Sequence, residues 1–379
     1  MPGAGRGLPG VADEGELSAH GTGILPRQVL ARLVAEGAIA GATAVAADQL
    51  QPASLDLRLG RVAHRIRASF LPARGESVDR RLDPLTLHTI DISAGAVLET
   101  GCVYLVPLEE RLALPGDLSA TTNPKSSTGR LDVFTRVICD GGAAFDRIPA
   151  GYAGPLYAEI SPRTFPVLVR SGSRLCQIRL RHGDSTIPDD ALAALSEREP
   201  LVAGGSARID GGLLVSIDLR PGRPGDLVGW RARRHTGVVD VDRRDAYRVE
   251  DFWEPVAARP EGLILDPDEF YILVSREAVR IPPGLAAEMV PFDPMVGEFR
   301  VHYAGFFDPG FGYGPAGEGS RAVLEVRSRE VPFMLEHGQV VARLAYECLA
   351  EPPDVLYGEA LASHYQSQNL KLSKHFRDG

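Results

Sequence analysis

The densest group of side chains that could do chemistry is the segment Asn123-Pro124-Lys125-Ser126-Ser127-Thr128-Gly129-Arg130. It brings an ammonium group, two adjacent hydroxyl groups and a guanidinium group into one short stretch. Phosphate oxygens need donors of this kind, and an arginine can bind them through two parallel hydrogen bonds. The alternative is a polar turn that enters a helix, with the serines as caps and the charges solvated. The spacing alone leaves both interpretations open.

Two further features could supply proton transfer or ligand contacts. Glu159 stands among alternating apolar residues, where a carboxylate on a strand needs a pocket or a cationic partner. A buried carboxyl has a raised pKa and suits proton shuttling; a solvated glutamate, or one paired with arginine for structure, is the alternative. The segment 145–154, with Arg147 and Tyr152, predicts a tight hairpin that could hold a base or sugar. A plain β-hairpin is the competing interpretation.

These features lie in a chain that repeats itself. The stretch SLDLR from Ser54 returns as SIDLR from Ser216, 162 residues later. The strand-like stretch around Glu159 returns around Glu325, 166 residues later. Matching segments in the same order and at nearly the same offset indicate a duplicated domain.

Each copy is rich in β-strand signals. Short runs such as GCVYLVPL, EFYILVS, GPLYAEI and RAVLEVR combine branched and aromatic residues between Gly, Pro or Asp. Their close spacing and turn signals predict an antiparallel sandwich or jelly roll. The clearest helix is PRQVLARLVAEGAI, which begins near Pro26 and stops at Gly37. We therefore predict a mainly β protein of tandem jelly-roll domains with a few short helices.

The same patterns suggest the domain boundaries. The start of the chain lacks the basic and apolar parts of a signal peptide, so we expect a flexible tail over residues 1–22. Polar and small residues mark a connection between the copies. The predicted parts are a first copy at 23–184, a linker at 185–208, a second copy at 209–350 and a C-terminal tail at 351–379.

Composition narrows the classes of function. With 379 residues, 44% apolar and 24% charged, the chain is an ordinary globular protein large enough for two cores. A formal charge of −9 argues against nucleic acid or a membrane surface as partner. The four cysteines stand singly in apolar runs, which favours buried free thiols over disulfides or metal ligands. No segment is long and apolar enough to span a membrane, so we expect a cytoplasmic protein.

The motifs together resemble a known family. The order PASLDLRLG, LPGDLSATTNPKSSTGR, RIPAGYAGPLYAEI and RLCQIRL is similar to that of the bacterial dCTP deaminases, and the two-copy length resembles an elongated branch of them. The similarity runs from about residue 25 to residue 180 and returns more weakly from about residue 209 to residue 347. It implies the distorted jelly roll, or dUTPase-like β-clip, that these enzymes share with the dUTPases.

The resemblance implies catalytic roles in the first copy. The family's phosphate-binding and catalytic segment has two serines and an arginine, which here are Ser126, Ser127 and Arg130. Lys125 replaces an arginine that usually precedes the serines. Glu159 falls on the catalytic glutamate, which takes a proton from a water attacking C4 of cytosine and then protonates the departing ammonia.

The resemblance also implies substrate contacts. Arg147 and Tyr152 fall where the family contacts the base and the deoxyribose, whereas Pro149 replaces an aspartate that binds the sugar hydroxyl. Tyr365 and Gln368 belong to a segment that resembles the tail closing over the triphosphate. Mg²⁺ would arrive with the triphosphate, held by phosphate oxygens and water, without metal ligands from the protein.

The second copy departs from the family at the phosphate segment. The aligned stretch Asp293-Pro294-Met295-Val296-Gly297-Glu298 has no serine and carries carboxylates instead of cations, which would repel a triphosphate. The stretch from Phe307 to Gly312, with Asp308, and Glu325 keep the pocket pattern. We therefore expect the chemistry in the first copy and a structural or regulatory role for the second.

The resemblance predicts hydrolytic deamination of dCTP to dUTP and ammonia, which feeds dUMP and dTTP synthesis. Zinc-dependent deaminases carry H-x-E and P-C-x-x-C motifs, and neither occurs in this sequence, so we expect a water activated by glutamate without zinc. The fold implies a homotrimer with sites between subunits. A dUTPase, a bifunctional deaminase and diphosphatase, and a non-catalytic nucleotide-binding protein are the alternatives.

Overall fold

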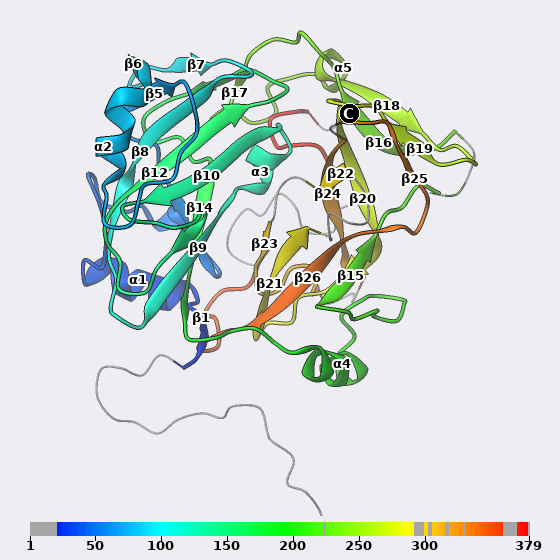
Figure 1. Cartoon of the computed structure of the whole chain (residues 1–379). Coiled ribbons are helices and arrows are strands. Elements are labelled where there is room, and N and C mark those ends of the chain that lie inside the picture. Colours follow the sequence, from blue (N-terminus) through cyan, green and yellow to red (C-terminus); the bar gives the residue numbers. More distant parts are fainter. Residues whose placement is uncertain are drawn as a thin grey trace, which may run out of the picture.

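The computed structural model describes residues 21–220, 222, 225–291, 299–301, 305–314, 318–328, 330–358 and 370–377. Its strands form two β-rich halves that lie side by side, the first coloured blue to green and the second yellow to orange (Figure 1). Nearly all strand pairs are antiparallel, and the helices are short. The prediction of a mainly β protein with a few short helices is confirmed.

The first copy contains two sheets. One has the strand order β11-β9-β14-β4-β3, with β1 also paired to β14. Its strands are β1 (Gly23–Ile24), β3 (Leu50–Gln51), β4 (Ser54–Leu57), β9 (Leu118–Pro124), β11 (Arg147–Ile148) and β14 (Cys176–His182). The other has the order β10-β12-β8-β5-β6, with β2 paired to β8. Its strands are β2 (Ile39–Gly41), β5 (Val62–Ile66), β6 (Thr86–Asp91), β8 (Val103–Ala113), β10 (Val133–Cys139) and β12 (Ala153–Pro162).

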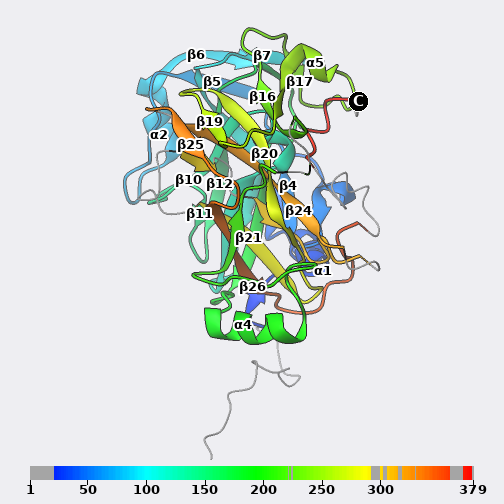
Figure 2. The same ribbon diagram turned by 90° about the vertical axis from the view of Figure 1, so that its right-hand side faces the viewer.

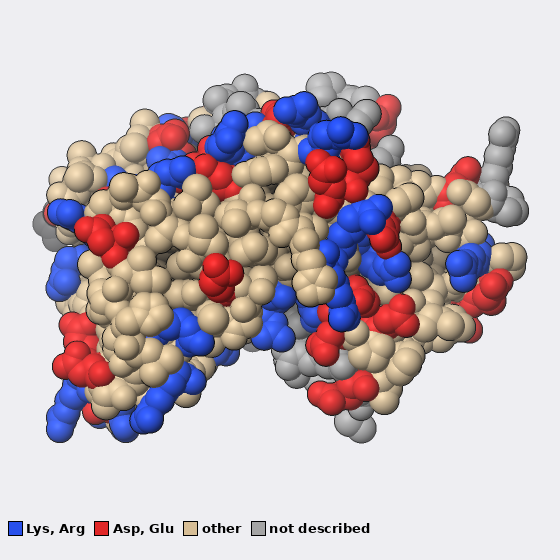
Figure 3. Space-filling view, turned by 90° about the horizontal axis from the view of Figure 1, so that it is seen from above, with Lys and Arg blue, Asp and Glu red and all other residues tan. Residues whose placement is uncertain are grey.

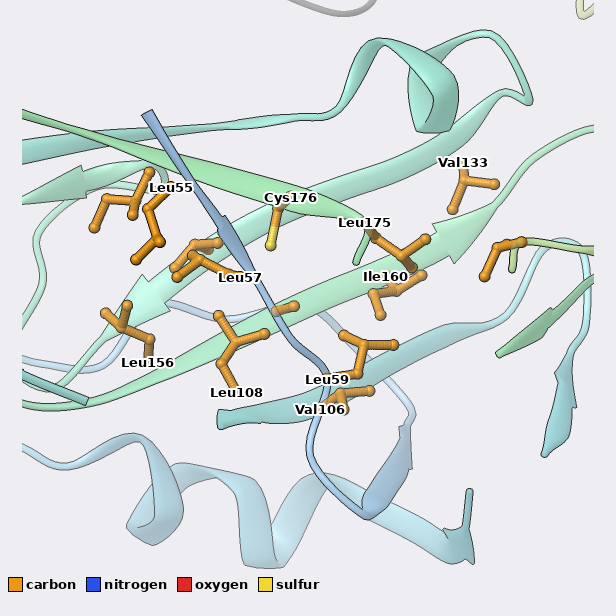
Figure 4. Packing of buried hydrophobic residues seen from close by; sticks show 14 of the residues in the cluster. Leu55, Leu57, Leu59, Val106, Leu108, Val133, Leu156, Ile160, Leu175 and Cys176 are labelled. Carbon is orange, nitrogen blue, oxygen red and sulfur yellow. The ribbon is translucent and has the colours of Figure 1, made fainter. Parts of the chain in front are cut away.

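The core of the first copy lies between these sheets. Side chains from both sheets meet there, among them Leu55 and Leu57 of β4, Val106 of β8 and Ile160 of β12 (Figure 4). Alternate residues of each strand point to one face of its sheet, so the branched residues that marked the strands in the sequence fill this space.

The second copy repeats this arrangement. Its sheets have the orders β15-β26-β21-β23 and β18-β16-β20-β24-β22. The strands are β15 (Leu213–Ser216), β16 (Leu227–Ala232), β18 (Trp253–Ala257), β20 (Phe270–Val279), β21 (Leu285–Pro291), β22 (Phe299–Val301), β23 (Phe306–Phe307), β24 (Ser320–Ser328) and β26 (Val340–Cys348). Glu159 of β12 is paired with Leu105 of β8, and Glu325 of β24 is paired with Ile272 of β20. The two glutamates therefore occupy equivalent positions.

Two small sheets and the helices complete the described chain. The sheets are β17-β13-β7, with β7 (Ala96–Leu98), β13 (Val167–Val169) and β17 (Val239–Asp240), and the pair β19 (Leu263–Leu265) and β25 (Phe333–Leu335). The helices are α1 (Arg27–Ala35), α2 (Val78–Leu82), α3 (Ser126–Gly129), α4 (Asp189–Arg198) and α5 (Val249–Phe252), with 3₁₀ turns at Ala47–Gln49 and Asp83–Leu85. Helix α1 is the predicted one, and it is followed by Gly37 at φ +80°. The predicted linker contains α4, which lies at one end of the molecule in Figure 2.

Buried arginines connect the two copies. Arg179 of β14 is fully buried and donates to Ala287 O at 2.9 Å and to Asp308 Oδ1 at 3.0 Å, both in the second copy. In the opposite direction, Arg327 of β24 is ion-paired with Asp132 of the first copy. Each buried arginine thus has a carboxylate partner in the other copy, and these pairs fix the position of one copy relative to the other.

The cysteines are reduced, and the surface carries charges of both signs. All four cysteines are free thiols, with Cys139 and Cys176 buried and Cys102 and Cys348 partly accessible. Burial raises the pKa of Cys139 to about 11. On the face shown in Figure 3, basic and acidic side chains are interspersed. In the part of the chain that the structure describes, no helix is both long and apolar enough to cross a lipid bilayer.

Candidate active site

A cavity lies between the two copies, where α3 of the first copy faces β23 and β24 of the second. The space between its lining atoms is about 660 Å³, a figure that includes space open to solvent. The polar side chains that the first copy contributes are Lys125, Ser126, Arg130 and Gln177. The second copy and the segment after it contribute Phe306, Phe307, Asp308, Phe311, Glu325 and Tyr357.

Helix α3 is a single turn that starts directly after β9. The amides of Thr128 and Gly129 donate to Lys125 O at 2.8 and 3.0 Å, which closes this turn. Ser126 is exposed and lines the cavity, whereas Ser127 is buried and does not line it. Of the two predicted serines, the structure therefore brings one hydroxyl group into the cavity.

Cations gather beside α3. The ammonium group of Lys125 is ion-paired with the buried Asp56, and the guanidinium group of Arg174 lies 3.9 Å from the same carboxylate. Burial and the neighbouring cations Lys125 and Arg244 lower the pKa of Lys374 to about 8. The cations Lys125, Arg174 and Lys374 form an electropositive corner beside α3 that suits an anionic ligand.

Glu325 and Arg130 face each other across the contact between the copies. Arg130 Nε lies 3.8 Å from Glu325 Oε1, and both side chains are almost completely buried. Burial raises the pKa of Glu325 to about 7, while the guanidinium group of Arg130 acts in the opposite direction. A carboxyl group with this pKa can accept and release a proton near neutral pH.

The hairpin after β23 forms the apolar wall of the cavity. Phe307 and Phe311 meet edge to face with ring centroids 5.0 Å apart. The chain turns at Gly312, where φ is +65° and a Cβ would lie 2.2 Å from Val279 O, so only glycine fits. Asp308 lies on this hairpin, and burial raises its pKa. The wall offers aromatic rings and one carboxyl group to a ligand.

The structure places Glu159 outside this cavity, so it does not meet Ser126 and Arg130 of the same chain. Glu159 Oε1 accepts from Arg136 Nη2 at 2.6 Å, and its side chain is buried. The Arg136 guanidinium in turn lies 3.4 Å from the centroid of the Phe145 ring. Within one chain, Glu159 is thus the structural partner of an arginine, which the sequence had left as an alternative.

Arg147 and Tyr152, the predicted base and sugar contacts, also lie outside this cavity, and residues of the second copy stand in the equivalent positions. Strand β11 pairs with β9 as β23 pairs with β21, which makes Phe306 the counterpart of Arg147 and Phe311 the counterpart of Tyr152. Arg147 is exposed, and the hydroxyl group of Tyr152 donates to Pro155 O at 2.6 Å. Neither side chain lines the cavity, whereas both counterparts do.

Some predicted residues lie outside the described residues. These are Tyr365 and Gln368 of the C-terminal tail, residues 1–20, and the segment 293–298. In the second copy, the retained pattern at 307–312 and at Glu325 was the signal that could have identified the cavity. The sequence did not indicate that these residues face α3.

The C-terminal segment 370–377 packs against the back of α3. Arg130 Nη1 donates to Lys371 O at 3.0 Å, and Ser373 Oγ donates to Ser127 O at 2.8 Å. The ring of His375 lies 2.9 Å from Ser373 Oγ, and burial lowers the pKa of His375 to about 4, so the ring is neutral. These contacts tie the end of the chain to the segment that carries Ser126 and Arg130.

Ser373→Ala is expected to lower the free energy of unfolding by about 1–3 kcal/mol, because it leaves buried polar partners unsatisfied. Urea unfolding of the variant beside the wild type measures this difference. Ser206→Ala, at an exposed position, is the matched control and should leave the transition midpoint in place. An unchanged midpoint for Ser373→Ala would contradict the anchoring role.

Among the residues that the structure describes, no group of three or more His, Cys, Asp or Glu side chains is placed to hold a metal ion. The cavity instead combines a protonatable carboxyl group, a hydroxyl group and cations. Such a set suits proton transfer next to a phosphate-bearing ligand.

Comparisons with known proteins agree with this chemistry. The model of the 2'-deoxycytidine 5'-triphosphate deaminase N-terminal domain matches residues 21–184, and that of the C-terminal domain matches residues 188–376. The crystal structure of 2'-deoxycytidine 5'-triphosphate deaminase from Agrobacterium tumefaciens is similar, with a TM-score of 0.86 and 59% sequence identity over 90% of this chain and 99% of that chain.

Shorter curated proteins match only part of the chain. The dCTP deaminase of Haloarcula marismortui is 33% identical over 135 residues, 34% of this chain and 65% of that protein. The protein named "dCTP deaminase, dUMP-forming" from Coprothermobacter proteolyticus is 32% identical over 135 residues, 34% of this chain and 67% of that protein. The chain thus spans about two thirds of the length of these curated relatives. The two domain matches and the similarity to the Agrobacterium structure show that the chain belongs to the 2'-deoxycytidine 5'-triphosphate deaminase family.

Proposed function

We propose that this protein is a dCTP deaminase, which hydrolyses dCTP with one water to dUTP and ammonia. The observation that carries the proposal is the cavity in which a glutamic acid with a pKa of about 7 faces Arg130 beside the hydroxyl group of Ser126. This combination lies in a chain whose family is named for the reaction.

In the proposed mechanism a glutamate takes a proton from a water that attacks C4 of cytosine. The resulting carboxylic acid gives this proton to the amino group, which leaves as ammonia. The other proton of the water moves from the C4 hydroxyl group to N3 as the C4 carbonyl forms. Ser126 and Arg130 would orient the water and stabilise the charge that develops on its oxygen. A carboxyl pKa near neutrality suits both proton transfers, because neither protonation state is strongly favoured.

The surrounding side chains suit the other parts of the nucleotide. The aromatic wall at Phe307 and Phe311 would contact the base, and Asp308 would accept a hydrogen bond from the sugar hydroxyl. The cationic corner with Lys125 and Lys374 would bind the triphosphate. Mg²⁺, which offsets phosphate charge, would be carried by phosphate oxygens and water, in keeping with the cationic rather than acidic lining on that side.

Several finer expectations remain part of the proposal. Two facing sheets in each copy support the distorted jelly-roll, dUTPase-like description of both domains. The C-terminal tail over residues 351–379, with Tyr365 and Gln368, would close over the triphosphate. We also propose a zinc-independent, cytoplasmic enzyme that assembles as a homotrimer.

A second candidate is a bifunctional enzyme that also removes pyrophosphate from the dUTP it forms. It is favoured by one observation: several similar curated proteins are named "dCTP deaminase, dUMP-forming". In that case dUMP and pyrophosphate would accumulate instead of dUTP.

Incubation of the purified protein with dCTP and Mg²⁺, without added zinc, tests the proposal. Ion-exchange chromatography and an ammonia assay should detect dUTP and ammonia in equal amounts. Appearance of dUMP and pyrophosphate would support the bifunctional enzyme. If dCTP stays intact, release of pyrophosphate from added dUTP would indicate a dUTPase, and no turnover of either nucleotide would indicate a binding protein.

A further inference from the structure

We propose that the active site is assembled in cis, from the two copies of a single chain, with Glu325 of the second copy as the catalytic acid–base residue. The first copy contributes Ser126 and Arg130 to the same site. This inference rests on the proposed deamination and assigns its residues and its place in the molecule.

The first argument is the contact between the copies. Glu325 and Arg130 are 195 positions apart in the chain, yet Nε and Oε1 lie 3.8 Å apart. Both residues line the cavity, together with Ser126. The serine, the arginine and the glutamate that deamination needs therefore meet within one chain.

The second argument is the difference between the equivalent glutamates. Glu325 Oε1 lies 3.8 Å from its arginine, and its side chain lines the cavity. Glu159 Oε1 instead accepts two hydrogen bonds from Arg136, at 2.6 and 3.1 Å. The Arg136 guanidinium also lies against the Phe145 ring and bonds to Ser69 Oγ at 3.0 Å. Arg136 thus holds Glu159 in an ion pair away from the cavity, whereas Glu325 lines it.

The third argument is the set of hydrogen bonds that join the two copies next to the cavity. The fully buried Arg179 donates to the carbonyl of Phe307, at 3.3 Å, and to Asp308, both on the hairpin that lines the cavity. Asn123, two residues before Lys125, donates to Glu288 Oε1 of the second copy at 3.1 Å. Several contacts next to the cavity thus join the two copies, so the site needs no partner chain to bring its halves together.

The two copies have also lost complementary parts. The second copy has no serine and no arginine in the segment aligned with the phosphate motif, while the first copy has its glutamate bound to Arg136. The phosphate segment of the first copy and the glutamate of the second copy together make one site per chain. The same reasoning explains why Asp308 is kept in the second copy, where the first copy has Pro149.

Matched variants test the identity of the acid–base residue. Glu325→Gln is expected to lower kcat by about 100-fold or more, as for loss of a general acid–base group, whereas Glu159→Gln should keep most of the activity. Circular dichroism and urea unfolding of both variants separate loss of folding from loss of chemistry. Retained activity in Glu325→Gln, or its loss in a folded Glu159→Gln, overturns the assignment.

Complementation tests the assembly in cis. Chains with Arg130→Gln and chains with Glu325→Gln, carrying different affinity tags, are coexpressed and purified by both tags in turn. Sites shared between subunits would regain activity in such mixed assemblies, because some sites would combine two intact halves. We expect no recovery, and any recovery well above the separate variants would overturn the proposal.

Two outcomes separate this inference from the proposed function. If the wild type deaminates dCTP but the variants behave otherwise, only the cis assignment fails. If the wild type leaves dCTP intact, the proposed function fails and the assignment fails with it. If no doubly tagged material can be isolated, an active wild type of monomeric size by light scattering supports the cis site.

Discussion

The kcat/KM for dCTP is expected to fall about tenfold for each pH unit below about 7, because Glu325 must be ionised to accept a proton from water. Burial raises the pKa of this carboxyl group to about 7. The fraction of enzyme with an ionised base therefore decreases as the pH falls through that value, and kcat/KM reports the free enzyme. Initial rates at several pH values, with dCTP well below KM, measure the profile.

The terminal phosphate of the substrate also ionises in this range, with a pKa of about 6. A control is therefore needed to separate ionisation of the substrate from that of Glu325. Arg130 lowers the pKa of Glu325. In Arg130→Gln, the acidic limb of the pH profile of the remaining kcat/KM should therefore move to higher pH. An ionisation of the substrate would stay in place in that variant. A limb that does not move, or a rate that is flat down to pH 5, would show that Glu325 does not control the reaction.

Arg179→Met is expected to lower the free energy of unfolding by about 3–5 kcal/mol, the usual cost of breaking a buried ion pair from one side. Arg179 is fully buried and donates to two carbonyl groups and to Asp308 of the second copy. Methionine preserves much of the volume but leaves those acceptors without the donor. Urea unfolding followed by tryptophan fluorescence measures the difference.

Arg61→Met is the matched control for this prediction. Arg61 lies 4.0 Å from Asp91, and its side chain is 74% exposed. Such exposed pairs contribute little to stability, so the control should unfold like the wild type. A loss of less than about 1 kcal/mol in Arg179→Met would mean that the contact between the copies does not depend on this arginine.

A substantial part of the fold and the site follows from local patterns in the sequence. Short runs of branched and aromatic residues between Gly, Pro or Asp identified strands β8, β12, β20 and β24, because such side chains favour extended backbone. The apolar spacing and Gly37 identified α1. The duplication and the segment with Ser126 and Arg130 were also visible, since each is a property of neighbouring residues.

The placement of the glutamate could not be predicted in this way. Glu159 and Glu325 have similar neighbours and equivalent strand positions, so no local signal distinguishes them. The difference lies in what packs against each: Arg136 holds Glu159, whereas Arg130 faces Glu325 from the other copy.

The sequence by itself determined the family, the two copies and the residue types of the site. Only the tertiary structure shows which residues of each copy line the cavity. The physical reason is that contacts between residues far apart, such as those of Arg179 with Asp308 and of Arg130 with Glu325, set the register between the copies. These long-range contacts depend on the assembled surfaces, and periodicity within either copy carries no information about them.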